Sequence, residues 1–372
     1  MKRVANEKTA GSTGRFSLDS AFSEAVIAWQ REHGRHTLPW QGTRDAYRVW
    51  LSEIMLQQTQ VAAVVPYYQR FLERFPDVAA LAAASQDEVM AYWSGLGYYS
   101  RARNLHRCAQ QVVSEYGGRF PGDPELLATL PGIGRSTAAA IAAFSYGARA
   151  AILDGNVKRV FCRVFGVEGF PGIKAVENAL WERAQALLPE QGIEAYTQGL
   201  MDLGATVCTR SRPACERCPL AQHCIALGEG RVHLLPTPKP AKVTPLRSTT
   251  MLVVEAQDQV LLEQRPDSGI WGGLLSLPEV VSQGEAQRAA VLAAAAPFGT
   301  ITGCEPLAPF THVFTHFKLQ IAPFHVTVAA PQAFAGETRY VWQPKAGLAQ
   351  AALPAPVKKL LLGLYAGGGR LI

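Results

Sequence analysis

The feature that most constrains this 372-residue chain is a group of four cysteines close together in the sequence. They follow the spacing C-x6-C-x2-C-x5-C, at Cys208, Cys215, Cys218 and Cys224. The chain has seven cysteines, an odd count, and thiols so near one another could hardly pair as two unstrained disulfides. Four thiolates can instead surround one metal centre. Spacing alone leaves zinc and an iron–sulfur cluster open, because both accept four cysteines.

Hydrophobic periodicity divides the rest of the chain into two regions. Residues 17–229 repeat apolar side chains at three- and four-residue steps, which predicts a helical domain. From 249 to 372 the pattern has period two, as in strands, with helical segments near 284–296 and 355–365. The expected fold is a mainly α domain that carries the cysteine loop, 208–224, followed by an α+β domain.

Two segments lie outside these predicted domains. Residues 1–16 carry charge but no apolar run, so we expect a disordered tail and no secretory signal. Residues 230–248 are rich in proline and basic side chains and contain no acid, which predicts an extended linker that could follow a phosphate backbone. No apolar stretch is long enough for a membrane span, so we expect a cytoplasmic protein.

Several features suit a polyanionic partner without requiring one. Lysine and arginine outnumber acidic residues by 36 to 30, which gives a net charge of +6. In the segment LPGIGRSTAAA, Gly132 and Gly134 precede a run of helix formers. This is either a tight turn between packed helices or a helix N-terminus whose free N–H groups hold a phosphate. Arg210 and Arg212, between the cysteines, could contact the same backbone or be ordinary solvated charges.

Two carboxylates have both an ordinary and a catalytic interpretation. Asp154 lies just before a helical segment, where it could cap that helix or face a developing cation. Glu53, at the margin of an apolar stripe, is either a surface residue or an acid whose pKa is raised by apolar neighbours. One acid and one ionised carboxylate are the pair that glycosidic cleavage uses. Gln57 and Gln58 add amides that suit base edges.

An aromatic pair also lies beside basic residues. Tyr98 and Tyr99 precede Arg101 and Arg103 in SGLGYYSRARN. The rings could stack on or wedge between bases while the arginines hold phosphates. Alternatively, both tyrosines belong to the hydrophobic core.

Taken together, these motifs resemble the adenine DNA glycosylase family of the MutY type. The matching segments are WLSEIMLQQTQV, GLGYYSRARNLH, LPGIGRSTA, ILDGNVKRV, MDLGATVCTRSRPACERCPLAQHC, RPDSGIWGGLLSLPE and FTHVFTHFKL, in the family's order. The resemblance implies a helix-hairpin-helix glycosylase fold with a [4Fe–4S] cluster, followed by a Nudix-like domain. It also implies a monofunctional enzyme, expected to be a monomer, that removes adenine from A:8-oxoguanine or A:G mispairs in double-stranded DNA.

The resemblance carries residue roles as well. Glu53 resembles the acid that protonates adenine, Asp154 the carboxylate that stabilises the oxocarbenium ion, and Asn156 a residue that orients the site. The residues that resemble the walls of the adenine pocket are Leu38, Trp40, Leu56 and Gln198. Gln58 and Tyr98 resemble residues that fill the vacated stack when the base is flipped out. The four cysteines resemble the cluster ligands.

The second domain resembles a reader of 8-oxoguanine rather than a hydrolase. Phe314, Thr315 and His316 fall at the reading position, with Thr where the family often has Ser. Gly273 and Glu279 keep the start of a Nudix box, but QRAAVL replaces its metal-binding carboxylates. Pyrophosphate hydrolysis is therefore not expected.

Other functions remain as alternatives. A glycosylase/lyase like endonuclease III needs an amine nucleophile, which Ser136 does not supply at the corresponding position. A Nudix pyrophosphohydrolase lacks its acidic run, and a purely DNA-binding protein would leave the pairing of Glu53 with Asp154 unexplained. Replication or repair proteins could dock on the linker. The sequence gives no role beyond packing to Cys108, Cys162 and Cys304.

Overall fold

The structure is a computed structural model that describes residues 13–240, 244–266, 269–281, 286–314, 316–331 and 339–365. By its internal contacts the chain divides into two compact units. The first unit comprises residues 1–82 and 107–241, and the second comprises residues 83–106 and 242–372. The second unit thus includes a helical segment that the sequence pattern assigned to the first domain.

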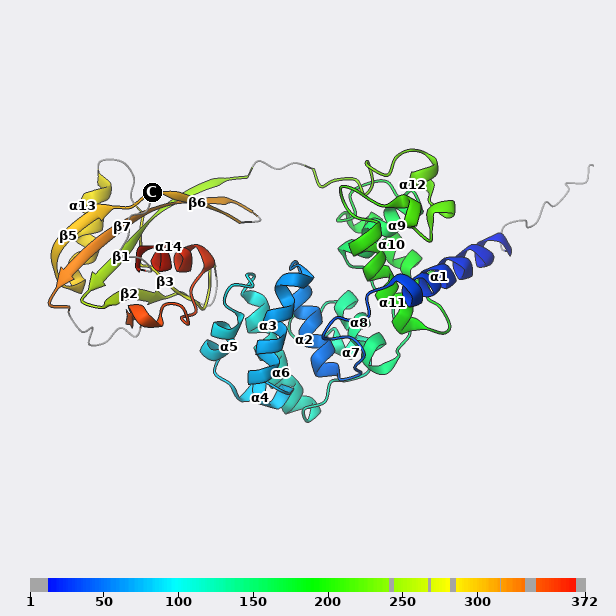
Figure 1. Ribbon diagram of the computed structural model, residues 1–372, viewed down its shortest axis with the longest axis horizontal. Coiled ribbons are helices and arrows are strands. Elements are labelled where there is room, and N and C mark those ends of the chain that lie inside the picture. The colour runs from blue at the N-terminus through cyan, green and yellow to red at the C-terminus, as the bar shows by residue number, and fades with distance from the viewer. Residues whose placement is uncertain are drawn as a thin grey trace, which may run out of the picture. The chain divides into compact units, whose positions relative to one another are not determined.

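The first unit is built from helices (Figure 1). They are α1 (Thr13–His33), α2 (Ala46–Leu56), α3 (Val61–Arg74), α4 (Val78–Ala83), most of α6 (Ser100–Tyr116), α7 (Pro124–Leu127), α8 (Arg135–Tyr146), α9 (Gly155–Val164), α10 (Lys174–Ala186), α11 (Ile193–Asp202) and α12 (Ile225–Gly228). Helix α1 begins inside the predicted tail, so the prediction of a disordered segment to residue 16 is wrong for residues 13–16. None of the described helices is long and apolar enough to cross a membrane.

Apolar faces of α1, α8, α9, α10 and α11 share one core. Phe22 of α1 packs edge-on against Phe161 of α9 and Tyr196 of α11, with ring centroids 5.9 and 6.5 Å apart. Small residues of α8, among them Ala139, Ala140 and Ala143, let these helices approach closely. This core positions the N-terminus of α9 and the C-terminus of α11, where the candidate site residues lie.

The chain does not continue as one helix from α2 into α3. Gln58 adopts the left-handed conformation, with φ of 57°. A residue other than glycine pays a steric cost at such an angle, and the helix cannot continue through it. The break separates Gln57 and Gln58 from the apolar stripe of α2.

The second unit holds an eight-stranded sheet among its described residues. Its strands are β1 (Leu246–Ala256), β2 (Gln259–Gln264), β3 (Leu275–Ser276), β4 (Glu279–Val280), β5 (Thr300–Pro306), β6 (Phe310–Val313), β7 (Lys318–Ala329) and β8 (Tyr340–Pro344). The main path runs β3-β2-β1-β7-β5, and β4, β6 and β8 pair with β1, β7 and β2. Strands β1 and β7 are parallel and the other pairs are antiparallel.

Local expectations for the second unit are confirmed. Strands β1 and β2, which lie in the region of period two, form a hairpin in which Ala256 pairs with Gln259 and Gln257 takes a positive φ of 55°. Helices α13 (Ala286–Ala295) and α14 (Ala355–Tyr365) lie where the sequence predicted helices. Alternate residues of β1 and β7, among them Leu252, Val254 and Val326, bury against Val291 of α13. The fold is therefore α+β, as expected.

The residues beside α5 (Gln86–Trp93), also in the second unit, correct one expectation. Arg101 is buried, donates Nη2 hydrogen bonds to the carbonyls of Leu96 and Gly97, and stacks on the rings of Trp93 and Tyr98. A guanidinium committed in this way is a packing element, so the suggestion that Arg101 holds phosphate is wrong. Tyr99 is buried, whereas Tyr98 is 47% exposed. Of the two tyrosines, Tyr98 alone keeps a ring available for stacking.

The predicted linker is anchored over its first half. Leu235 is buried in the first unit, and its carbonyl accepts a hydrogen bond of 2.8 Å from Arg163 Nε of α9. Strand β1 then begins at Leu246, before the predicted end of the linker. The buried Leu235 attaches the first part of this segment to the core, and β1 includes its last residues, so the linker is shorter than the predicted 230–248.

Candidate active site and cysteine loop

A cavity of about 420 Å³ opens between α2, α11 and the segment that joins α1 to α2. Its walls include five residues singled out from the sequence: Leu38, Trp40, Glu53, Leu56 and Gln198. Its size falls within the range of small-molecule pockets, and its lining combines apolar side chains with a few polar groups. The structure therefore gathers the predicted pocket walls around Glu53.

Glu53 lies on α2 within this cavity. Burial raises the pKa of its carboxyl from 4.5 to about 8, and the negative charge of Asp154 adds to the shift. Both effects disfavour the charged form, so Glu53 is protonated at neutral pH. Its neighbours Leu51 and Ile54 are part of the buried stripe of α2, which carries Glu53 into the protein. Glu53 itself is partly buried and faces the cavity, so it is not a freely exposed surface residue.

Asp154 caps α9, as the ordinary interpretation expected, and does so beside Glu53. Its Oδ1 accepts a hydrogen bond of 2.8 Å from Val157 N, and its Oδ2 accepts one of 3.4 Å from Asn156 Nδ2. Burial raises the pKa of Asp154, while these two hydrogen bonds and the charge of Arg159 oppose the rise. The carboxylate is thus held at a fixed place and has lost much of its hydration. Such a group gains strongly from a cation formed next to it.

A chain of hydrogen bonds connects Asp154 to the cysteine loop. Arg159 donates Nη2 to Asn156 Oδ1 at 2.9 Å and to the Gly204 carbonyl at 2.7 Å, while its Nε donates to the Cys208 carbonyl at 2.7 Å. Gly204 belongs to the π-helical turn Leu203–Val207 that follows α11. A Cβ at Gly204 would lie 2.5 Å from the Cβ of Asn156, so only glycine fits. Arg159 therefore connects the first residue of the cysteine loop to Asn156.

Ser136 supports Asp154 through the backbone. Its hydroxyl accepts a hydrogen bond of 2.9 Å from Leu153 N, directly before Asp154. In the turn that precedes α8, Gly132 has a positive φ of 79°, a conformation that favours glycine. Gly134 is extended and serves as the N-cap of α8. Gly134 is exposed, and a Cβ there would meet open space. The turn leaves the first N–H groups of α8 facing outward.

The four cysteines of the loop face one small cavity. Cys208, Cys215, Cys218 and Cys224 all line it, together with apolar residues of α9 such as Val160 and Val164. The buried Arg163 holds the loop, since its guanidinium donates to the carbonyls of Thr209 and Arg210 at 2.7 and 3.1 Å and approaches Cys208 Sγ at 3.4 Å. Arg210 and Arg212 are exposed on the loop surface.

This arrangement fits an iron–sulfur cluster. Four thiols around one small cavity are the ligand set that such a cluster takes. The nearby Arg163 guanidinium supplies a positive charge and a donor for a thiolate. The other cysteines, Cys108, Cys162 and Cys304, are buried in hydrophobic packing.

Other predicted residues lie outside the lining of the 420 Å³ cavity. Gln57 is partly buried, Gln58 is exposed, and Tyr98 has a left-handed φ of 49°. Strained residues of this kind often mark functional positions.

In the second unit, Phe314 stacks on Phe317 at 4.5 Å and packs against Trp271 and His312. His316 is exposed. Thr315 lies outside the described residues.

The residues that remain of the Nudix box form hydrogen bonds and an ion pair with neighbouring side chains. Glu279 forms an ion pair of 2.9 Å with Arg265 and accepts a hydrogen bond of 3.0 Å from Thr249 Oγ1. Gln287, at the start of QRAAVL, donates to Thr250 Oγ1 at 2.7 Å. A carboxylate neutralised by arginine is poorly suited to bind a divalent cation.

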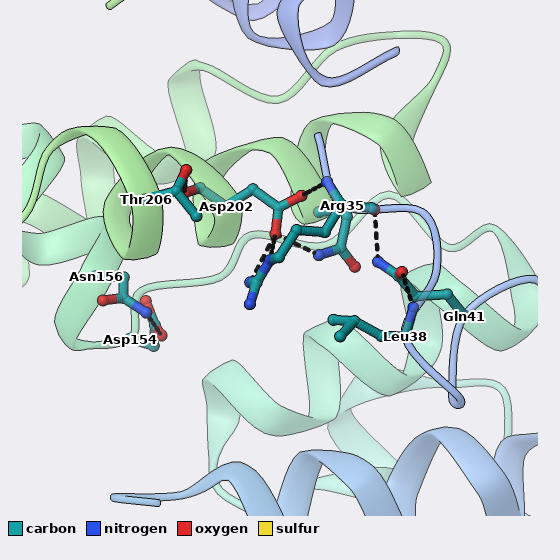
Figure 2. Close-up of polar contacts among 8 residues, drawn as sticks. Arg35, Leu38, Gln41, Asp154, Asn156, Asp202 and Thr206 are labelled. Carbon is teal, nitrogen blue, oxygen red and sulfur yellow. Dashed lines mark hydrogen bonds and ion pairs between the residues drawn. The ribbon is translucent and has the colours of Figure 1, made fainter. Parts of the chain in front are cut away.

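Sequence reasoning missed a polar group beside the cavity. Figure 2 shows Arg35 meeting the carboxylate of Asp202, and Gln41 bridging the backbone at Arg35 and Leu38. Arg44 and Glu194 form a further ion pair of 2.8 Å at the cavity wall. Arg35 and Asp202 are 167 residues apart, and no local pattern signals that they meet.

Family models agree with this geometry. The model for "HhH-GPD superfamily base excision DNA repair protein" matches residues 51–186, and the "iron-sulfur binding domain of endonuclease III" matches residues 208–224. A NUDIX domain model matches residues 249–363. The loop match, with four thiols around one cavity, identifies a [4Fe–4S] cluster as the cofactor.

Two solved structures share the helical fold. A thermostable thymine-DNA glycosylase is 28% identical, with a TM-score of 0.53, over 59% of this chain and all of that chain. Endonuclease III in a non-covalent DNA complex is 21% identical, with a TM-score of 0.50, over 58% of this chain and 97% of that chain.

Relatives with curated names cover nearly the whole chain. The adenine DNA glycosylase of Buchnera aphidicola is 35% identical over 341 residues, which are 91% of this chain and 96% of that protein. The human adenine DNA glycosylase is 37% identical over 81% of this chain and 66% of its own length. With this similarity over both units, the chain belongs to the adenine DNA glycosylase family of base excision repair enzymes.

Proposed function

We propose that this enzyme excises adenine mispaired with 8-oxoguanine or guanine in duplex DNA and leaves the backbone uncut. The observation that carries the proposal is a protonated Glu53 in the cavity wall, within reach of the negative charge of Asp154, whose carboxylate is fixed as the cap of α9. Glu53 donates its proton to adenine as the N-glycosidic bond breaks. Asp154 stabilises the oxocarbenium ion that remains, and Asn156 orients Asp154 by donating a hydrogen bond to its Oδ2.

The cavity walls hold the flipped base. Leu38, Trp40 and Leu56 supply apolar contacts, and Gln198 supplies an amide. Gln57 and Gln58 approach base edges or the vacated stack, and the exposed, strained Tyr98 inserts its ring there. Inserting side chains offsets the cost of unstacking the extruded nucleotide.

The DNA backbone is held by the turn at α8 and by the cysteine loop. The outward N–H groups after Gly132 and Gly134 suit a phosphate, and the exposed Arg210 and Arg212 suit its neighbours. Ser136 stands where a lyase would carry its lysine; a hydroxyl forms no imine, so the strand stays intact. Its hydrogen bond to Leu153 N instead places Asp154.

The second unit reads the opposite base through Phe314, Thr315 and His316. The stacked rings of Phe314 and Phe317 give this strand end a rigid support. With Glu279 paired to Arg265, nucleotide pyrophosphate hydrolysis is not part of the function.

We further infer that the enzyme works as a monomer in the cytoplasm, on the nucleoid. The exposed part of the linker is available to replication or repair proteins.

Cys208, Cys215, Cys218 and Cys224 hold the cluster, which supplies a rigid crosslink for the arginine-bearing loop. We expect purified protein to show broad visible absorbance and about four irons per chain, and Cys218→Ala to lose both. Cys304→Ala, in the second unit, is the control and keeps the iron. Stoichiometric zinc in place of iron would contradict this prediction.

Incubation with a duplex that carries adenine opposite 8-oxoguanine tests the activity. We expect release of free adenine, and cleavage of the strand only after alkali or heat. A duplex with adenine opposite thymine is the control. Strand incision without alkali that persists in a Glu53→Gln variant would refute the proposal.

The rate of adenine release is expected to depend on pH through Glu53. Because its pKa is about 8 and the protonated form is active, the single-turnover rate should fall about tenfold per pH unit above pH 8. Protonation of Asp154 should lower the rate at acidic pH. The measurement is a rate profile at constant ionic strength, and a flat profile from pH 7 to 10 would remove Glu53 as the acid.

A further inference from the structure

Asp202, the last residue of α11, carries a fully buried carboxylate beside the cavity. It accepts hydrogen bonds from Arg35 N at 2.8 Å and Arg35 Nε at 2.7 Å, and forms an ion pair of 2.7 Å with Arg35 Nη2 (Figure 2). Gln198 Nε2, one helical turn earlier, donates to the same carboxylate at 2.9 Å. Asp202 does not line the cavity, but Arg35 and Gln198 both do.

This contact determines which end of the Gln198 amide faces the cavity. An ionised carboxylate only accepts hydrogen bonds, so the amide must turn its NH2 group to Asp202. The carbonyl Oε1 then points away from Asp202. In the part of the chain that the structure describes, Gln198 has its one side-chain hydrogen bond to Asp202, so Oε1 is available as an acceptor.

The second amide at the cavity is not available for a ligand in the same way. Gln41 donates Nε2 to the Arg35 carbonyl at 2.8 Å, and its Oε1 accepts from Leu38 N at 3.0 Å. Its amide therefore braces the segment from Arg35 to Leu38. Of the two amides, Gln198 is the one positioned to read a base.

We propose that Asp202 is a positioning residue that makes the site selective for 6-aminopurines, because it fixes Gln198 Oε1 as the acceptor for the exocyclic amino group of adenine. This inference rests on the proposed function. A 6-oxopurine such as hypoxanthine would place its own acceptor against Oε1, and two facing acceptors leave a buried group unpaired. Sites built to hydrogen-bond one substrate group discriminate strongly against an analogue without it.

The test measures single-turnover rates of base release from two duplexes, which carry deoxyadenosine or deoxyinosine opposite 8-oxoguanine. Their ratio is the amino selectivity. We expect Gln198→Met, which leaves the Arg35–Asp202 pair intact, to lower this ratio about tenfold or more. An Arg35→Met/Asp202→Leu double variant replaces the buried ion pair by apolar side chains and frees the amide to rotate. It is expected to lower the ratio by a similar factor.

A third variant separates positioning from a merely structural role. If Asp202 acts through Gln198, adding Gln198→Met to the double variant should lower the ratio no further. Glu168→Gln, which breaks an exposed ion pair with Arg231 away from the cavity, is the control and should leave the ratio unchanged.

An unchanged ratio in Gln198→Met, or equal losses of both rates in the double variant, would overturn this inference while leaving the proposed function intact. If the wild-type enzyme released neither base, the proposed function would fail, and this inference with it.

Discussion

Replacing Glu53 by glutamine is expected to lower adenine release by about a thousandfold and, at the same time, to stabilise the protein. The loss of activity follows because an amide has no proton to give the leaving base, and a positioned general acid contributes about 10²–10⁴ in rate. The variant is more stable because ionisation of Glu53 favours the unfolded state of the wild type: the pKa of Glu53 is about 8 in the folded protein and 4.5 ordinarily. At pH 7 the unfolded chain ionises this group and the folded chain does not.

The sign of this effect sets its pH window. A raised folded-state pKa contributes stability that is complete below pH 4.5 and is lost as the pH rises through 8. At pH 7, which lies 2.5 pH units above the ordinary pKa of 4.5, this lowers the free energy of unfolding of the wild type by on the order of 3 kcal/mol, which corresponds to several degrees in Tm. Glutamine does not ionise, so the Tm gain of Glu53→Gln should be absent near pH 4, grow through pH 7 and level off above pH 8.

Thermal unfolding at several pH values, alongside adenine release at 25 °C, provides the measurement. Glu73→Gln, an exposed residue of α3, is the matched control and should change neither quantity. A Glu53→Gln variant with lower Tm at pH 8, or with wild-type turnover, would contradict the assignment of a buried, protonated acid.

Asp154→Asn is the second large effect, again about a thousandfold in adenine release, with binding to DNA retained. A unit charge about 4 Å from a developing cation, at an effective dielectric near 20, stabilises it by about 4 kcal/mol. The substitution removes the charge but keeps an oxygen that can accept from Val157 N, so the cap of α9 survives. The loss should therefore be in chemistry and not in folding.

Single-turnover rates and titration of the same duplex separate the two quantities. Asp77→Asn, which keeps the cap oxygen that accepts from Ala80 N at the start of α4, is the matched control. Equal losses in rate and affinity would mean that Asp154 acts through the fold. Unchanged turnover would remove Asp154 from the reaction.

The stability of Glu53→Gln illustrates a general feature of this site. Glu53 and Asp154 are both carboxyl groups whose pKa is raised by burial, and the charge of Asp154 further disfavours ionisation of Glu53. Their proximity costs stability in the free enzyme, and the developing cation of the substrate relieves that cost. Sites that trade stability for activity in this way are common in enzymes.

Much of the chemistry could be read from the sequence, because it depends on contacts between residues close together in the chain. The spacing of Cys208, Cys215, Cys218 and Cys224 predicted a metal centre. Asp154 caps a helix only three residues ahead of its donor Val157, and the hairpin at Gln257 is equally local. The resemblance to a glycosylase family, which the similarity to adenine DNA glycosylases over both units confirms, rests on such short motifs.

The tertiary structure alone decided what depends on burial and on distant partners. Periodicity placed Glu53 at the edge of an apolar stripe, but only packing around α2 raised its pKa. Arg101 looked like a phosphate contact, but it is buried and its guanidinium donates hydrogen bonds to the carbonyls of Leu96 and Gly97. Asp202 meets Arg35 from 167 residues away and so turns the Gln198 amide. Desolvation and long-range hydrogen bonds are properties of the assembled fold, and no local run of residues encodes them.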